Sequence, residues 1–308
     1  MTHRVVVADT KATDIDAIEE TLSDAAIETI EAREPSAVID DARGADALIV
    51  DSGTQVTAAV LEELDSLSVV GRSGIGVDNI DVAAAEREGT AVVNVPDYCV
   101  DEVSTHALSL ALACLRRLET YDHGVAEGSW DWTRGRPIRR LAGSTVGLVA
   151  FGAIARRLAS KLRDFDVSVL AYDPYVPEYR MGDFGVEKVG FEELLSRSSI
   201  VSIHAPLTDE TRGMFDAEAF DAMREDAILV NTARGPIVEE DALAAALRSG
   251  GIDSAGIDVR EEEPPDDSSL HGREDVLLTP HVAWYSEDSR TELAHSVATD
   301  VDRVLRGE

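Results

Sequence analysis

The alternation of strand-like and helix-like segments is the feature that most limits the fold of this chain. In the first hundred residues, short apolar runs rich in β-branched side chains predict strands at 4–8, 27–32, 47–51, 68–72 and 91–95, and helical patterns lie between them at 14–24, 57–65 and 81–89. The apolar runs are unbroken rather than alternating, which is typical of parallel strands covered by helices on both faces. The sequence therefore predicts an α/β fold.

A second series of the same kind follows a long predicted helix at 101–122. Its strands are expected within 144–152, 167–173, 199–206, 227–235, 251–259 and 276–280, and an amphipathic helix at 287–306 ends the chain. A chain of 308 residues is long enough for two domains, each with its own core. We expect two α/β units joined by the 101–122 helix, and the last helix could pack on either.

The composition is strongly acidic. The chain has 28 basic and 60 acidic residues, a net charge of −32, and its only lysines are Lys11, Lys161 and Lys188. The acidic residues are spread through every segment, so they repel one another throughout the fold unless salt screens them. At about 1 M salt the Debye length is only about 3 Å. The composition is typical of a cytoplasmic protein from an organism with a very salty interior, and it argues against nucleic acid or an anionic membrane as a partner.

The cysteines and the apolar stretches indicate the compartment. Cys99 and Cys114 are too few for a disulfide framework. The first residues enter a predicted strand directly, without a signal-peptide pattern, and the apolar stretch at 106–115 is too short to span a bilayer. We therefore expect a soluble cytoplasmic protein, without a metal site.

The first strand of the second series ends in a turn typical of dinucleotide binding. In TVGLVAFGAIARRLASKL (145–162), the three glycine positions of the GxGxxG pattern hold Ala150, Gly152 and Ala155. The central glycine is the one that lets the backbone approach a pyrophosphate at the helix N-terminus. Asp173 follows Gly152 by 21 residues, at the end of the next predicted strand, where an acidic side chain accepts the ribose hydroxyls of NAD. An ordinary strand–helix turn is the alternative interpretation.

Several longer blocks resemble one family, the D-isomer-specific 2-hydroxyacid dehydrogenases. The blocks are GRSGIGVDNIDVAAAEREGTAVVNVPDYCVDEVSTHAL (71–108), TVGLVAFGAIARRLA (145–159), ILVNTARGPIVEEDALAAAL (228–247), AGIDVREEEPP (255–265) and LLTPHVAWYSEDS (277–289). They follow the family's order from about residue 45 to the last helix. The resemblance implies two doubly wound parallel-sheet domains flanking a cleft. Residues 1–100 with 286–308 would form a flavodoxin-like substrate domain, and residues 101–285 a Rossmann dinucleotide-binding domain.

The resemblance also implies three catalytic residues. Reduction of a 2-keto acid requires that the carboxylate be held and that the keto oxygen be polarised and protonated. Arg234 matches the arginine that grips the substrate through its forked guanidinium. His281 matches the proton donor. Glu263 matches the carboxylate that pairs with this histidine and favours its charged form.

The family's binding residues can be placed on this chain in the same way. The cofactor would contact Gly152, Ala153, Ile154, Asp173, His204, Ala205, Pro206, Thr211, Thr232, Ala233, Asp258 and Ala283, with Asp258 reaching the nicotinamide carboxamide. The substrate would contact Ser52, Ile75, Gly76, Tyr98 and Trp284, with the backbone of Ile75 and Gly76 forming an anion nest. Core packing is the alternative for Tyr98 and Trp284, and also for Cys99, which is expected to border the same pocket. His106 is expected only to pack.

The implied function is the stereospecific, NAD(P)H-dependent reduction of 2-keto acids to D-2-hydroxy acids and the reverse reaction. Within the family, a phosphoglycerate- or hydroxypyruvate-type dehydrogenase is an alternative, whereas formate dehydrogenases have glutamine where Glu263 stands. From another class, an NADH-binding corepressor or sensor of the same fold would bind the cofactor without turnover. Asp173 favours NAD(H), while screening by salt and the nearby Arg180 would allow NADP(H). The resemblance further implies a homodimer joined through the cofactor domains.

Overall fold

The computed structural model describes residues 2–8, 13–266 and 268–308 of the chain, which form two compact units. Unit 1 comprises Met1–Cys99 and Tyr285–Glu308, and unit 2 comprises Val100–Trp284. Both are α/β units with entirely parallel sheets, so the predicted fold class is confirmed. Among the helices that the structure describes, none combines the length and apolarity that a membrane span needs.

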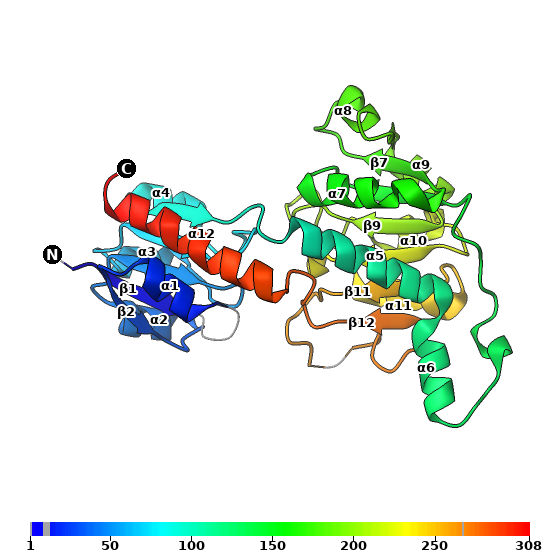
Figure 1. Ribbon diagram of the computed structural model, residues 1–308, viewed down its shortest axis with the longest axis horizontal. Helices are drawn as coiled ribbons and strands as arrows, with labels where there is room; N and C mark the ends of the chain where they lie inside the picture. The colour runs from blue at the N-terminus through cyan, green and yellow to red at the C-terminus, as the bar shows by residue number, and fades with distance from the viewer. Residues whose placement is uncertain (1, 9–12, 267) are drawn as a thin grey trace. The chain divides into compact units, whose positions relative to one another are not determined.

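Unit 1 is built on a five-stranded parallel sheet in the order β2-β1-β3-β4-β5. The strands are β1 (Arg4–Ala8), β2 (Ala26–Thr29), β3 (Ala47–Val50), β4 (Val69–Arg72) and β5 (Ala91–Asn94). The helices are α1 (Ile15–Thr21), α2 (Pro35–Ala42), α3 (Ala58–Glu63), α4 (Val82–Glu88) and the C-terminal α12 (Glu287–Leu305). Helix α12 packs on α1 and β4. In Figure 1 it is the red helix beside α1. Strands β1, β3 and β4 are buried almost throughout, which explains their unbroken apolar sequences.

Unit 2 is built on a seven-stranded parallel sheet in the order β12-β11-β10-β9-β6-β7-β8. The strands are β6 (Thr145–Val149), β7 (Ser168–Tyr172), β8 (Glu187–Lys188), β9 (Ile200–Ile203), β10 (Ile228–Asn231), β11 (Ser254–Ile257) and β12 (Val276–Leu278). The longer helices are α5 (Val100–Arg116), α6 (Leu118–Ala126), α7 (Ala153–Leu162) and α11 (Glu240–Ser249); the shorter ones are α8 (Glu178–Gly182), α9 (Phe191–Arg197) and α10 (Ala217–Ala222). Three 3₁₀ turns, η1 (Trp132–Gly135), η2 (Arg163–Phe165) and η3 (Gly235–Ile237), complete the described elements.

The strand order of unit 2 reverses between β6 and β9. In doubly wound sheets, ligands bind beyond the carboxyl ends of the strands at such a reversal. The sheet has helices on both faces, with α5 and α7 side by side on one of them (Figure 1). The loops that follow β6 and β9 therefore lie where a dinucleotide is expected.

The expectation of a single helix at 101–122 is wrong, because the structure has two helices, α5 and α6, with a break at Arg117. Arg117 adopts a left-handed backbone conformation, with φ 52°. Its guanidinium donates to the Asp253 carboxylate at 2.6 Å and to the Asp253 backbone oxygen at 3.3 Å. This tertiary contact offsets the cost of the left-handed residue, which the helical periodicity alone could not reveal.

Candidate functional site

The site residues expected in unit 2 follow the carboxyl ends of its strands. Gly152 follows β6, Asp173 follows β7, and the 204–206 segment follows β9. Beyond β10, β11 and β12 lie Thr232, Ala233 and Arg234, then Asp258 and Glu263, then His281 and Ala283. Because all the strands are parallel, these loops share one edge of the sheet.

Glu263 and His281 form a hydrogen-bonded pair. Nδ1 of His281 lies 2.6 Å from Oε2 of Glu263. An ionised carboxylate only accepts hydrogen bonds, so Nδ1 carries the hydrogen and Nε2 is left for another partner. About a third of each side chain is exposed, 32% for His281 and 36% for Glu263. The pair can therefore exchange a proton with a bound molecule through Nε2.

The backbone of His281 is held in an uncommon conformation. Its φ is 53°, in the left-handed region that non-glycine residues seldom adopt. The His281 N–H donates to the backbone oxygen of Asp258 at 2.7 Å and to that of Thr279 at 3.1 Å. Such strain persists only where surrounding contacts impose it, and it is concentrated at functional sites. These contacts aim the imidazole toward Glu263.

The environment of Glu263 favours its ionised form. Burial by itself would raise the pKa of this carboxyl. The hydrogen bond and charge of His281, the Arg260 N–H at 2.9 Å and the charge of Arg234 together outweigh burial, so the pKa of Glu263 lies below its ordinary value. The carboxylate is lost only as the pH falls through this lowered pKa, so the pair is intact at neutral and mildly acidic pH.

The loop that carries Glu263 is fixed by a buried ion pair that the sequence did not indicate. Arg260 donates to both carboxylate oxygens of Glu240, on α11, at 2.8 Å each. Glu240 also accepts the Glu261 N–H at 3.0 Å and the Ser268 hydroxyl at 3.0 Å. Bidentate geometry of this kind is the strongest that an arginine offers. Arg260 and Glu240 are far apart in sequence, and no motif signalled the contact.

Gly235 brings the Arg234 loop against the Glu263 loop. A Cβ atom on Gly235 would lie 1.7 Å from the backbone oxygen of Arg260 and 2.5 Å from the backbone nitrogen of Glu261. Only glycine permits this approach of two backbones. Arg234 itself is partly buried, and one guanidinium nitrogen donates to the Ala233 backbone oxygen at 2.8 Å. The backbone that carries Arg234 therefore packs directly against the backbone of the Glu263 loop.

The residues around the β6 turn fit a dinucleotide. Gly152 precedes α7, and a Cβ atom placed on it would meet nothing within 4 Å. No side chain caps this N-terminus of the ten-residue α7, so its N–H groups are open to an anion. Ala150, at the first glycine position, has φ 70°, a conformation that costs a non-glycine residue about 1 kcal/mol. Ala155 is fully buried. The two alanines therefore preserve the shape of the turn.

Asp173 is held at the end of β7 by backbone donors. Its Oδ2 accepts the Phe151 N–H at 2.9 Å, and its Oδ1 accepts the N–H groups of Tyr175 at 2.9 Å and Val176 at 3.2 Å. These bonds fix the carboxylate beside the β6 turn. A fixed negative charge suits ribose hydroxyls and opposes a phosphate there.

Two threonines expected at the cofactor differ in the structure. Thr232 is buried, and its hydroxyl has no hydrogen-bond partner in the part of the chain that the structure describes. An orphaned buried hydroxyl suits a bound ligand. The Thr211 hydroxyl instead donates to the Pro206 backbone oxygen at 2.6 Å, so it closes its own loop. His204 lies in this region with its pKa lowered to about 4 by burial, and it is therefore neutral at neutral pH.

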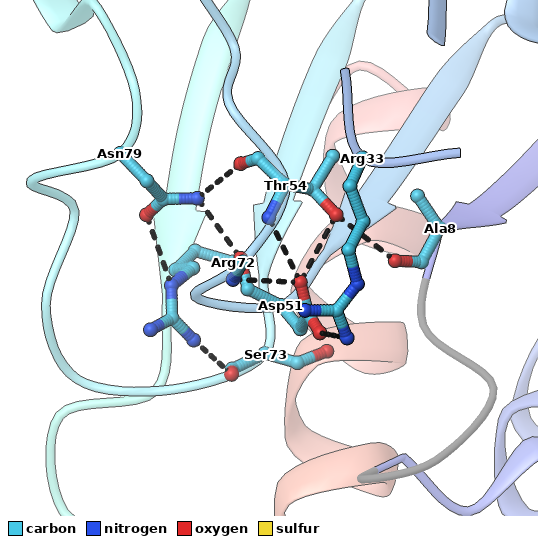
Figure 2. A network of polar contacts seen from close by, with 8 residues as sticks. Ala8, Arg33, Asp51, Thr54, Arg72, Ser73 and Asn79 are labelled. Atoms are coloured by element: carbon cyan, nitrogen blue, oxygen red, sulfur yellow. Dashed lines mark hydrogen bonds and ion pairs between the residues drawn. The ribbon is translucent and has the colours of Figure 1, made fainter. Parts of the chain in front are cut away.

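In unit 1, a polar network fixes the loops after β3 and β4 (Figure 2). Asn79 donates to the backbone oxygens of Asp51 at 2.9 Å and Thr54 at 2.6 Å, and it accepts from Arg72 at 3.3 Å. The Asp51 carboxylate accepts the Thr54 N–H at 3.0 Å and pairs with Arg33 at 3.3 Å. These contacts leave the loop conformations little freedom.

The expected substrate residues of unit 1 lie on or beside these loops. Ser52 is exposed after β3, and Tyr98 is buried after β5. The Ile75 backbone oxygen accepts from Asn94 at 2.6 Å, which ties the loop after β4 to β5. Within the described ranges, the N–H groups of Ile75 and Gly76 have no hydrogen-bond partner, as an anion nest requires. Trp284 belongs to unit 2, where it is half-buried.

Comparison with known proteins identifies the class to which this fold and site belong. Residues 108–283 match the family model described as "D-isomer specific 2-hydroxyacid dehydrogenase, NAD binding domain". The hydroxypyruvate reductase of Thermotoga maritima is 36% identical over 263 residues, which cover 84% of this chain and 85% of that protein. The chain therefore belongs to the D-isomer-specific 2-hydroxyacid dehydrogenase family.

Other similar proteins are longer than this chain or have solved structures. The D-3-phosphoglycerate dehydrogenase of Methanocaldococcus jannaschii is 38% identical over 272 residues, which cover 88% of this chain but 52% of that protein. The chain thus spans about half the length of such relatives. The TT0316 protein of Thermus thermophilus superposes with a TM-score of 0.87 at 29% identity, over 99% of this chain and 97% of that one. The D-lactate dehydrogenase of Aquifex aeolicus, complexed with NAD and lactic acid, superposes with a TM-score of 0.91 at 24% identity over 99% of this chain and 96% of that one, which supports the fold.

Proposed function

We propose that this protein is an NAD(H)-dependent D-2-hydroxyacid dehydrogenase that interconverts 2-keto acids and D-2-hydroxy acids. The observation that carries the proposal is the 2.6 Å pair of His281 and Glu263, on a loop packed against the loop that carries Arg234. Two ordinary loop residues have no reason to combine a strained backbone with a short shared hydrogen bond. Strained backbone is concentrated at functional sites, and a carboxylate on one ring nitrogen of a histidine sets the tautomer that acid–base chemistry uses.

The residues would act together on a 2-keto acid. Arg234 would hold the carboxylate and polarise the keto oxygen. His281, with Nδ1 hydrogen-bonded to Glu263, would donate a proton from Nε2 to that oxygen, and Glu263 would stabilise the charged imidazole beforehand. Gly152, the α7 N-terminus and Asp173 would hold the dinucleotide, and Asp258 would hold its carboxamide. NADH, when bound, supplies the hydride.

Turnover of a panel of keto acids tests the proposal. Purified protein in multimolar KCl would be assayed by NADH and NADPH absorbance with glyoxylate, pyruvate, hydroxypyruvate and a branched 2-keto acid. We expect at least one keto acid to be reduced to the D product, and NADH to be used better than NADPH because of Asp173. Binding of NADH without turnover of any member would instead favour a sensor.

The panel also separates the substrate types within the family when 3-phosphohydroxypyruvate is added. Next to the expected substrate residue Ser52, the Asp51 carboxylate is 13% exposed, and the Arg33 guanidinium that pairs with it is 56% exposed. Turnover of 3-phosphohydroxypyruvate would assign the protein to the phosphoglycerate type, and turnover of only the uncharged-substituent members of the panel would assign it to another type of the family.

We infer that two copies of the chain associate through α6 and η1. Trp130 is 91% exposed and Trp132 67% exposed, and Leu118 and Val125 on α6 are also exposed. Large apolar side chains gathered in this way are typical of an interface. The segment also carries Arg134, Arg136, Arg139 and Arg140 in a chain of net charge −32. A second copy of this acidic chain supplies complementary charge.

Substitution of Trp130 by aspartate is therefore expected to convert a dimer into a monomer. The change buries a charge in the interface and removes an aromatic anchor. Light scattering after size exclusion would measure the mass, with Tyr179→Asp as the control because Tyr179 is 67% exposed on α8. A monomeric wild type, or a Trp130 variant that remains dimeric, would contradict this assignment.

A further inference from the structure

Unit 2 contains a second histidine that reaches the residues around Asp258. His106 lies on α5, and its Nε2 is 3.1 Å from the hydroxyl oxygen of Thr279. The Thr279 hydroxyl donates to Oδ1 of Asp258 at 2.6 Å. The expectation that His106 only packs is thus incomplete, because its side chain takes part in a polar chain that links α5 to the ends of β11 and β12.

The direction of donation along these hydrogen bonds follows from the number of hydrogens on the Thr279 hydroxyl. A hydroxyl has one hydrogen, and that of Thr279 points to Asp258. The Thr279 oxygen can therefore only accept from His106, so Nε2 of His106 carries a hydrogen. Donation runs from His106 through Thr279 to the carboxylate. Each bond in such a chain polarises the next, which strengthens the whole.

Asp258 depends on these donors because it is buried. It is 1% exposed, and its carboxylate also accepts the N–H groups of Val282 and Ala283 at 2.9 Å each. His106, with Nε2 3.7 Å from Oδ1, is its basic neighbour. A buried carboxylate is stable only when its oxygens are satisfied. The Val282 N–H binds Oδ1 and the Ala283 N–H binds Oδ2, and the Thr279 hydroxyl adds a second donor to Oδ1, so Thr279 and His106 complete the hold on the carboxylate.

We propose that His106 is a positioning residue for the nicotinamide end of the cofactor. By donating to Thr279 it supports the hydrogen bond from Thr279 to Oδ1, which together with the two backbone donors holds the Asp258 carboxylate in the orientation that receives the carboxamide. This inference rests on the proposed function in one respect, the assignment of Asp258 to the carboxamide. In this role His106 acts through Thr279 and Asp258.

Binding of two nucleotides separates this role from a general structural one. NADH carries the nicotinamide, whereas ADP-ribose lacks this base and keeps the adenosine, the pyrophosphate and the second ribose. We expect His106→Leu, which removes the donor but fills the position with an apolar side chain, to weaken NADH binding about tenfold, the size expected for the loss of one hydrogen bond. The dissociation constant of ADP-ribose should change by less than about twofold, since its contacts are those of Gly152, α7 and Asp173. Calorimetry on the full-length protein measures both.

Two further variants test the route through Thr279. His106→Gln places an amide donor near the position of Nε2, so it should restore NADH binding to near the wild-type value. Thr279→Val removes the hydroxyl that links His106 to Asp258. The double variant His106→Leu/Thr279→Val should bind NADH no more weakly than Thr279→Val alone, because the two residues act in series.

Each outcome either supports or overturns the proposed role of His106. Equal weakening of NADH and ADP-ribose by His106→Leu, or unchanged binding of both, would overturn the proposal, and so would failure of His106→Gln to restore binding. Additive losses in the double variant would exclude the route through Thr279. Because these measurements need no keto acid, they remain decisive if the wild type binds NADH but reduces no substrate, in which case the proposed function fails separately.

Discussion

Replacement of His281 by alanine is expected to lower kcat for 2-keto acid reduction by about 10²- to 10⁴-fold, the range typical of a lost general acid. The side chain is the one group in the described chain that both pairs with Glu263 and offers a second nitrogen outward. Without it, the keto oxygen develops negative charge with no proton donor in place. Stopped-flow or steady-state absorbance of NADH measures the loss.

The His281→Ala variant should still bind NADH. The residues that fit the adenosine and pyrophosphate lie on the loops after β6 and β7, and His281 reaches Asp258 through its backbone N–H, which alanine keeps. NADH binding by His281→Ala should therefore stay within about threefold of wild type, since distant sites act independently. His295→Ala, on α12 of unit 1, is the matched control and should retain full activity. Full activity in His281→Ala would remove the basis of the dehydrogenase assignment.

Replacement of Gly235 by alanine is expected to disrupt the site through the backbone. The new Cβ would lie 1.7 Å from the Arg260 oxygen and 1.9 Å from its carbonyl carbon, and both atoms belong to a loop pinned by the Arg260–Glu240 ion pair. One of the two loops must move. Overpacking of this kind costs about 1–3 kcal/mol of folding free energy.

The kinetic consequence of Gly235→Ala should exceed its effect on stability. Moving either loop separates Arg234 from the Glu263–His281 pair, and a displacement of about 1 Å at a catalytic group costs about 100-fold in rate. Thermal unfolding and kcat/KM would be measured together. Gly182→Ala is the control, because a Cβ there meets nothing within 4 Å and the residue is helical. Wild-type kcat/KM in Gly235→Ala would show that the two loops are not held as the structure has them.

Much of the fold was predictable because its signals are local. Unbroken apolar runs and the helices between them identified the α/β class, and the strands of both series fall within a few residues of their expected positions. The break at Arg117 was not predictable, because it depends on Asp253, which is 136 residues away. A helical pattern continues through such a break until a distant side chain makes the left-handed residue acceptable.

The candidate site, like the fold, was predictable from the sequence only in part. The sequence by itself determined the family, through the blocks around Gly152, Arg234, Glu263 and His281, and it placed those residues at strand ends. Only the tertiary structure decided how these residues are held. His281 has a left-handed backbone, and the ion pair of Arg260 with Glu240 fixes the loop that carries Glu263. Hydrogen bonds from His106 through Thr279 reach Asp258. Residue types and spacing specify what a side chain can do. Orientation depends on contacts between segments that only folding brings together, and a hydrogen bond requires its two atoms to be within about 3 Å.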